Sequence, residues 1–392
     1  MKYDFNQETH RANTYALKWD GFENELPMWV ADMDFKTAPC VQEALQNRVN
    51  HGIFGYSIVP PAYFESIQQW WKNRHRVNYD PAWMLFSTGV VPAISSIVRK
   101  ITTPAENVLI QSPVYNIFYN SIYNNGRNIL SNDLVYQQGE YTIDFNDLEQ
   151  KLALPQTTLM ILCNPHNPIG KIWSKEELAQ IGELCAKYHV TVLSDEIHCD
   201  IVEPGYHYTP FASVNATCQQ ISITCVAASK VFNLAGLQSA CVIVPDPFLR
   251  HKVNRGLNTD EVAEPNAFAV TANIAAFSYG EEWVEELNQY IDENKQLWMN
   301  YIKQYLPKLH IVPSHATYLV WMDISYYSKD ADLFVAELRK QTGLYITSGS
   351  EYGKNAKTFV RVNLATQRKN VEQALQLLFQ FLNEEETSYG TI

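Results

Sequence analysis

Long apolar runs and basic clusters are both missing from this sequence of 392 residues. No stretch approaches the ~20 consecutive apolar residues that a membrane-spanning helix requires, and residues 1–20 are polar, without the apolar core of a secretion signal. Acidic residues outnumber basic ones, 42 to 30, and the formal net charge is -12. An acidic surface repels the phosphate backbone of nucleic acids. We therefore expect neither a membrane protein nor a nucleic-acid-binding protein.

Cysteine is also scarce, with seven residues along the whole chain. An odd number, without the paired spacing of a zinc site, excludes a complete disulfide framework and does not indicate a metal centre. We expect buried thiols in a reducing compartment, and we place the protein in the cytoplasm. Low-complexity tracts and internal repeats are absent as well, so a fibrous or repeat protein is not expected.

The composition that remains is that of a large globular protein. Hydrophobic residues make up 46% of the chain and charged residues 18%, with 9 Trp, 23 Tyr and 17 Phe spread along its length. Such a chain can bury a sizeable core, and its length favours two domains over one. An enzyme is therefore plausible.

The middle of the chain predicts an α/β fold. Short apolar runs alternate there with longer amphipathic stretches, the pattern of βαβ units around a mostly parallel sheet. Ser174 and Glu177 form the capping box of one of the intervening helices. The predicted strands are residues 108–111, 159–163, 190–194, 221–225 and 241–244.

A long helix is predicted between about residues 281 and 306, where aromatic and aliphatic positions recur at helical spacing before Pro307. Beyond it we expect strands at 318–322 and 359–364 and helices at about 330–341 and 371–382. This pattern indicates a large domain of residues 46–286. A smaller α+β domain would comprise residues 287–392 together with an N-terminal arm, residues 1–45.

Polar features follow predicted strands, at the edge where open α/β sheets bind ligands. Residues 87–92 (STGVVP) begin a helix whose free N–H groups suit a phosphate, although a simple cap has the same sequence. Residues 163–170 (CNPHNPIG) form a proline-rich turn. Asn167 could point its amide at a ligand, or the turn's Asn side chains could bond their own backbone.

Two charged residues end or follow buried strands. Asp195 closes an apolar strand, where a partly desolvated carboxylate needs a cationic partner such as a protonated ring nitrogen; otherwise it is a helix N-cap. Lys230 lies in residues 227–236 (AASKVFNLAG), whose apolar character favours a neutral amine able to form a Schiff base. Most lysines, however, are solvated surface groups.

In this order the motifs resemble the fold-type I pyridoxal 5'-phosphate (PLP) enzymes of the aspartate aminotransferase superfamily. The resemblance implies a PLP-dependent transferase-like fold. It also implies that Lys230 holds the cofactor, that Asp195 pairs with its pyridine nitrogen and that Asn167 bonds its ring hydroxyl. Tyr115, in residues 112–115 (SPVY), would stack on the ring. Gly89, Val90, His198 and Ser229 would complete the cofactor site.

A narrower resemblance is to the cystathionine β-lyase group that is often named for the maltose-regulon modulator. It spans residues 11 to 364 and implies that Arg361 and Asp32 contact the substrate. Tyr56 would reach the cofactor phosphate of a second subunit, so a homodimer is expected. The segments that carry this likeness are residues 11–14 (RANT), 18–20 (KWD), 29–35 (WVADMDF), 55–56 (GY), 194–198 (SDEIH), 230–238 (KVFNLAGLQ) and 359–364 (FVRVNL).

The sequence departs from the broad aminotransferase pattern near the cofactor. Gln238 stands where many relatives have a phosphate-binding Arg, and His198 stands where many have Tyr. Ala227 lacks a hydroxyl that some relatives have. From the residues alone, His198 could be a packed core histidine, which is the more common fate, and Arg361 could equally form a structural salt bridge.

The expected reaction is β-elimination from a sulfur-containing amino acid, giving pyruvate, ammonia and a thiol. Cystathionine, cysteine and S-conjugates remain open as substrates. An aminotransferase shares the early steps and is the nearest alternative, because it differs only in returning a proton to the cofactor. A regulatory binding protein is a further alternative, although the acidic charge disfavours direct contact with DNA.

Overall fold

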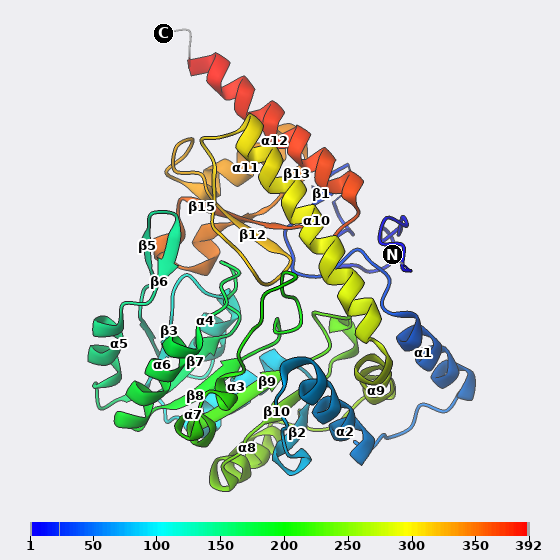
Figure 1. The fold of residues 1–392 in the computed structure, drawn as a ribbon, viewed down its shortest axis with the longest axis vertical. Coiled ribbons are helices and arrows are strands. Elements are labelled where there is room, and N and C mark those ends of the chain that lie inside the picture. The colour runs from blue at the N-terminus through cyan, green and yellow to red at the C-terminus, as the bar shows by residue number, and fades with distance from the viewer. Residues whose placement is uncertain (1, 23, 390–392) are drawn as a thin grey trace.

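The computed structural model describes residues 2–22 and 24–389, with side chains described up to residue 383. Figure 1 shows a sheet flanked by helices in the middle of the chain and a second, smaller sheet beside two long helices near the C-terminus. Among the described residues, none of the helices is long and apolar enough to cross a membrane.

The larger sheet has seven strands in the order β2-β10-β9-β8-β7-β3-β4. Strand β10 runs antiparallel to its neighbours β2 and β9, and the remaining neighbours are parallel. The strands are β2 Met84–Ser87, β3 Asn107–Ile110, β4 Asn128–Ser131, β7 Thr157–Cys163, β8 Thr191–Asp195, β9 Ser222–Val226 and β10 Ala240–Ile243. The five strands predicted for this region are all present, with ends that agree to within about two residues.

Helices cover both faces of this sheet because its strands alternate between two apolar cores. In β7, Leu159 and Ile161 pack on the side of α3 and α4, whereas Met160 and Leu162 face the side of α5 and α6. The predicted capping box of α6 is present, between Ser174 and Glu177. The helices are α3 Val90–Ile101, α4 Asn116–Tyr123, α5 Phe145–Leu152, α6 Lys175–Lys187, α7 Ala216–Ile221 and α8 Pro247–Thr259.

The smaller sheet is antiparallel, in the order β11-β12-β15-β14. Its strands are β11 His310–Ile311, β12 Leu319–Asp323, β14 Thr347–Ser348 and β15 Phe359–Asn363. Helices α10 (Glu281–Tyr305), α11 (Ala331–Thr342) and α12 (Arg368–Tyr389) pack around it, and Figure 1 shows α10 alongside α12. The N-terminal segment joins this region, because β1 (Leu26–Pro27) pairs in parallel with β13 (Leu344–Tyr345).

The remaining elements connect or flank the two sheets. Helices α1 (Pro39–His51) and α2 (Pro61–Trp70) pack against α9 (Ala269–Tyr279), and α2 continues as a π-helix, Trp71–His75. Strands β5 (Val135–Gln137) and β6 (Glu140–Thr142) form a hairpin. Short 3-10 helices span Pro81–Trp83, Phe211–Ser213, Ala235–Leu237, Gly349–Tyr352 and Lys354–Ala356.

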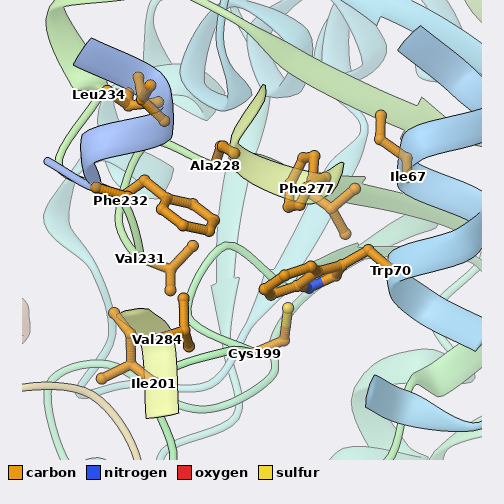
Figure 2. Close-up of a cluster of buried hydrophobic side chains, with 14 of the residues drawn as sticks. Ile67, Trp70, Cys199, Ile201, Ala228, Val231, Phe232, Leu234, Phe277 and Val284 are labelled. Carbon is orange, nitrogen blue, oxygen red and sulfur yellow. The ribbon is translucent and has the colours of Figure 1, made fainter. Parts of the chain in front are cut away.

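A buried apolar cluster holds the turn that follows β9. Figure 2 shows Val231 and Phe232 of that turn among Trp70 from α2, Phe277 from α9 and Val284 from α10. The Phe232 ring lies so close to Gly280 that an added Cβ there would meet it at 2.3 Å. Because the residues directly after Lys230 are anchored in this core, the lysine is held in a fixed position.

Candidate active site

A cavity of about 520 Å³ opens where the carboxyl ends of the parallel strands meet the smaller sheet. Open α/β sheets bind ligands at this edge. The site residues on the larger sheet end or follow strands β2, β3, β7, β8 and β9, and Arg361 lies on β15. Nine of the residues singled out from the sequence line this cavity: Gly89, Val90, Tyr115, Asn167, Asp195, His198, Ser229, Lys230 and Arg361.

Lys230 presents an amine whose charge is disfavoured. Its Nζ donates a hydrogen bond to the carbonyl of Ala31 at 2.7 Å. Burial and the positive charge of Arg361 lower the pKa of Lys230 to about 8, against the opposing charges of Asp32 and Asp195. A minor but much larger fraction of this amine than of an ordinary lysine is therefore neutral near physiological pH, and the neutral form is the one that acts as a nucleophile or base.

Asp195 is a nearly fully buried carboxylate at the end of β8. Burial raises the pKa of Asp195 to about 6, although a hydrogen bond from the Ile197 N–H to Oδ1 at 3.2 Å and the charge of Lys230 oppose the shift. The backbone bond matches the capping interpretation, while the position in the cavity matches the cation-binding one. A cation placed beside this carboxylate would offset the unfavourable burial.

His198 is buried, and its ring lies edge-on to that of Tyr318, with 6.1 Å between the two ring centres. Burial, together with the charges of Lys230 and Arg361, lowers the pKa of His198 well below its usual value, so the imidazole is neutral. Its Nδ1 finds no hydrogen-bond partner in the part of the chain that the structure describes. A buried polar atom that lacks a partner beside a cavity indicates room for a polar ligand.

Arg361 is held across the boundary between the two sheets. Its Nη1 donates to Oδ1 of Asn167 at 3.2 Å, and its Nη2 donates to the carbonyl of Trp29 at 2.9 Å. The guanidinium also lies 4.8 Å from the ring centre of Tyr352. Within the described residues Arg361 takes part in none of the ion pairs, so its charge is available to an anionic ligand.

The side chain of Asn167 is thus turned toward Arg361, unlike that of Asn164, which donates to the carbonyl of Thr209 at 2.9 Å. Tyr115 directly precedes α4, and burial raises the pKa of its hydroxyl. Its phenol therefore stays protonated.

The N-terminus of α3 forms another wall of the cavity. Gly89 is the residue before the helix, and Val90 begins it. The N–H groups of the first turn have no partner within the helix, so this wall suits an anion. Ser229, Gln238 and Ser239 also line the cavity, and their hydroxyl and amide groups can donate to the same anion.

Two of the residues singled out from the sequence lie elsewhere. Asp32 is not among the lining residues, and Arg11 donates to both of its carboxylate oxygens, at 2.7 and 3.2 Å. Its negative charge nevertheless raises the pKa of Lys230. Tyr56 is fully exposed on the segment between α1 and α2, beside the exposed side chains of Phe54 and Ile58.

Some residues that line the cavity were not identified from the sequence. They come from the N-terminal segment, the start of α4 and the region around β14, namely Trp29, Asn116, Thr347, Glu351 and Tyr352. Trp29 belongs to a recognised segment, but nothing in the sequence indicated that it reaches the cavity. The others carry no motif, and Asn116 is more than 200 residues away from Thr347, Glu351 and Tyr352 in the chain, so only the tertiary structure shows that they line one cavity.

The model of the aminotransferase class I and II family matches residues 25–378, which is most of the chain. The chain belongs to this family. Over 380 residues it is 42% identical to cystathionine beta-lyase PatB of Bacillus subtilis, covering 95% of this chain and 98% of the relative.

Solved structures of two other proteins agree with the family fold. Cystalysin from Treponema denticola, whose structure contains a PLP cofactor, has a TM-score of 0.95 at 29% identity, covering 98% of this chain and all of that one. The PLP-bound C-S lyase from Staphylococcus hominis has a TM-score of 0.91 at 32% identity, covering 97% and 98%. The expected fold type I, with a mostly parallel sheet and a smaller sheet, is thereby confirmed.

Proposed function

We propose that this family member is a PLP-dependent carbon-sulfur β-lyase of the cystathionine β-lyase type. It would cleave the bond between Cβ and sulfur of an amino acid, giving pyruvate, ammonia and a thiol. The observation that carries the proposal is the 42% identity to a cystathionine beta-lyase over nearly the whole chain. The cavity adds a lysine with a lowered pKa and an arginine that would bind the substrate carboxylate.

The residues present fit PLP. The N-terminus of α3, with Ser229 and Gln238, suits the phosphate, and the buried carboxylate of Asp195 suits a protonated pyridine nitrogen. The unpartnered Nδ1 of His198 offers a further polar contact. Lys230 supplies the amine for the covalent link.

Gly89, Val90 and Ser229 would hold the phosphate, which explains how binding proceeds with Gln238 in the place of an arginine. Tyr115 would lie against the ring. His198, being neutral, would contact the ring without adding a competing positive charge.

When bound, PLP supplies an electron-withdrawing ring that acidifies the Cα proton of the attached amino acid. The Nζ of Lys230 would remove that proton, since its lowered pKa makes the neutral amine more accessible than in an ordinary lysine. Asp195 would hold the proton on the ring nitrogen. Arg361, oriented by Asn167, would bind the α-carboxylate with its planar fork and so place Cα near Lys230.

Asp32 would act at a distance, as a substrate-site residue that affects Lys230 by its charge. Its carboxylate is paired with Arg11 but still favours the protonated lysine. It would thereby keep the pKa of Lys230 from falling further and help this residue to return a proton.

A homodimer is part of the proposal, with Tyr56 reaching the phosphate in the cavity of the other subunit. Large apolar side chains are exposed around it, on the segment between α1 and α2: Ile53 at 67%, Phe54 at 53%, Tyr56 at 106% and Ile58 at 80%. Such a group of exposed apolar side chains is typical of a surface that binds a partner.

Two further expectations remain proposals. We divide the chain into a large domain, residues 46–286, and a small domain of residues 1–45 and 287–392, in keeping with the two sheets and with the pairing of β1 and β13. We place the enzyme in the cytoplasm, in keeping with seven free thiols, six of which are buried.

The alternative is an aminotransferase, which the description of the family model favours. The two activities are separated by incubating the protein with cystathionine and PLP, without a keto-acid acceptor. A lyase gives pyruvate, ammonia and homocysteine over many turnovers. A transaminase stops once its cofactor is converted to the amine form, so pyruvate at no more than enzyme stoichiometry would contradict the lyase proposal.

A further inference from the structure

One charged residue of the cavity has no part in the proposed reaction. Among the described lining residues, the acidic and basic side chains are Lys230, Arg361, Asp195 and Glu351. In the proposed reaction, Lys230 and Asp195 contact the cofactor, and Arg361 binds the α-carboxylate of the substrate. Glu351 is therefore the charge that the rest of the substrate meets.

Glu351 lies at the outer end of the cavity. It is partly open to solvent, whereas its neighbour Tyr352 is 2% exposed and Arg361 is 4% exposed. The centre of the Tyr352 ring is 4.8 Å from the Arg361 guanidinium, and the charge of Arg361 acts on the Glu351 carboxyl. Arg361, Tyr352 and Glu351 line the same cavity, so the tail of a substrate whose α-carboxylate is bound to Arg361 can reach Glu351.

A residue of α4 lies beside the Glu351 carboxylate. Asn116 follows Tyr115 at the start of α4, and its Nδ2 lies 3.4 Å from Oε2 of Glu351. Ile117 and Trp29 add apolar surface to the cavity. The cavity thus combines apolar walls suited to methylene groups with a carboxylate and an amide that lie beside each other.

The carboxylate of Glu351 lacks a cationic partner. Within the described residues it forms none of the ion pairs, and the bond from Asn116 is long. Partial burial raises the pKa of Glu351, an effect that Arg361 opposes and Asp332 reinforces. A carboxylate in this setting gains more from an arriving cation than one in open water, because screening by solvent is weaker.

We propose that Glu351 selects substrates whose sulfur-linked tail carries an ammonium group, as the distal amino acid of cystathionine does. This inference rests on the proposed lyase function. Glu351 binds the distal ammonium, and the Asn116 amide lies beside it to donate to a distal carboxylate. A tail that carries only a carboxylate is repelled.

Four cysteine thioethers test the proposal, because they share the bond that breaks and differ only in the tail. They are L-cystathionine, S-(3-aminopropyl)-L-cysteine, S-(3-carboxypropyl)-L-cysteine and S-propyl-L-cysteine. The native enzyme should prefer the aminopropyl to the carboxypropyl compound. Glu351→Gln should lower that preference about tenfold, mainly through KM, since the tail is remote from the bond that breaks.

Glu351→Lys should reverse the preference and favour the carboxypropyl compound. Glu337→Gln is the matched control, because it removes one exposed carboxylate on α11 that does not line the cavity. It should leave all four rates as they are. An unchanged preference in both Glu351 variants overturns the proposal.

Binding separates this inference from the lyase function. The holoprotein of the Lys230→Ala variant performs no elimination, so calorimetry measures the Kd of each compound directly. If the native enzyme releases no pyruvate from any of the four, the lyase function is wrong. Even then, tighter binding of the aminopropyl than of the carboxypropyl compound to the Lys230→Ala variant, lost when Glu351→Gln is added, would support Glu351 as the selecting residue. Equal Kd values for the two compounds would overturn the inference.

Discussion

Nη1 of Arg361 lies 3.2 Å from Oδ1 of Asn167, which joins a strand of the smaller sheet to the turn after β7 of the larger one. The bond orients the guanidinium over the cavity, together with the carbonyl of Trp29 and the ring of Tyr352.

Arg361→Lys should therefore raise KM for the amino-acid substrate by about tenfold or more. Lysine retains the charge but loses the two-pronged geometry and the stacking on Tyr352. Steady-state kinetics measures the effect, with the cofactor absorbance as a check that PLP is still bound. An unchanged KM would mean that Arg361 has a structural role only.

Borohydride reduction of the holoenzyme should attach the cofactor to Lys230, as peptide mapping by mass spectrometry will show. Lys295 is an internal control, because burial also lowers its pKa to about 8. Its Nζ donates to the carbonyl of Ala316 at 3.2 Å and does not line the large cavity. A tag on Lys295 would contradict the assignment and show that a low pKa alone decides the site.

The rate at which the apoprotein combines with PLP should rise with pH and level off above about pH 8. The neutral amine is the reactive form, and Lys230 has a pKa of about 8 instead of the usual 10.5. Arg361→Gln should move the midpoint to higher pH, because a neighbouring positive charge is removed. Asp32→Asn should move it to lower pH, because a negative charge is removed. Stopped-flow absorbance measures both, and shifts in the same direction would refute this electrostatic account.

Asp195→Asn should leave PLP bound but slow removal of the Cα proton about 10²-fold or more, since an amide does not stabilise a protonated ring nitrogen. The amide oxygen can still accept the Ile197 N–H, so a residue that only caps the turn would tolerate the change. Exchange of the Cα proton with solvent deuterium measures the step. Glu196→Gln is the control, as Glu196 is buried but lies outside the cavity.

Mixing inactive Lys230→Ala subunits with impaired Tyr56→Phe subunits should restore activity after subunit exchange. In a heterodimer one of the two sites regains both native groups. Recovery is measured against each variant incubated alone. Its absence, with heterodimers present by mass spectrometry, would show that Tyr56 does not reach the second cavity.

Much of the fold and the inner part of the site could be predicted from the sequence, because these features are encoded locally. The strands of the parallel sheet are mostly apolar runs, and the chain places Asp195 at the end of one and Lys230 shortly after another. The polar residues at the ends of neighbouring parallel strands are brought together by the sheet itself. The capping box of α6 needed only the spacing of Ser174 and Glu177.

Only the tertiary structure decided how segments without a local sequence pattern contact one another. Asp32 proved to be paired with Arg11, and Asn167 with Arg361, 194 residues further along the chain. Glu351 reaches the cavity from a short 3-10 helix after a two-residue strand, where no periodicity or motif exists. The sequence by itself determined which residues can do the chemistry, since amine, carboxylate and guanidinium groups are local properties. Their pairing and their pKa values depend on burial and on neighbours from distant segments, and these arise only when the two sheets pack together.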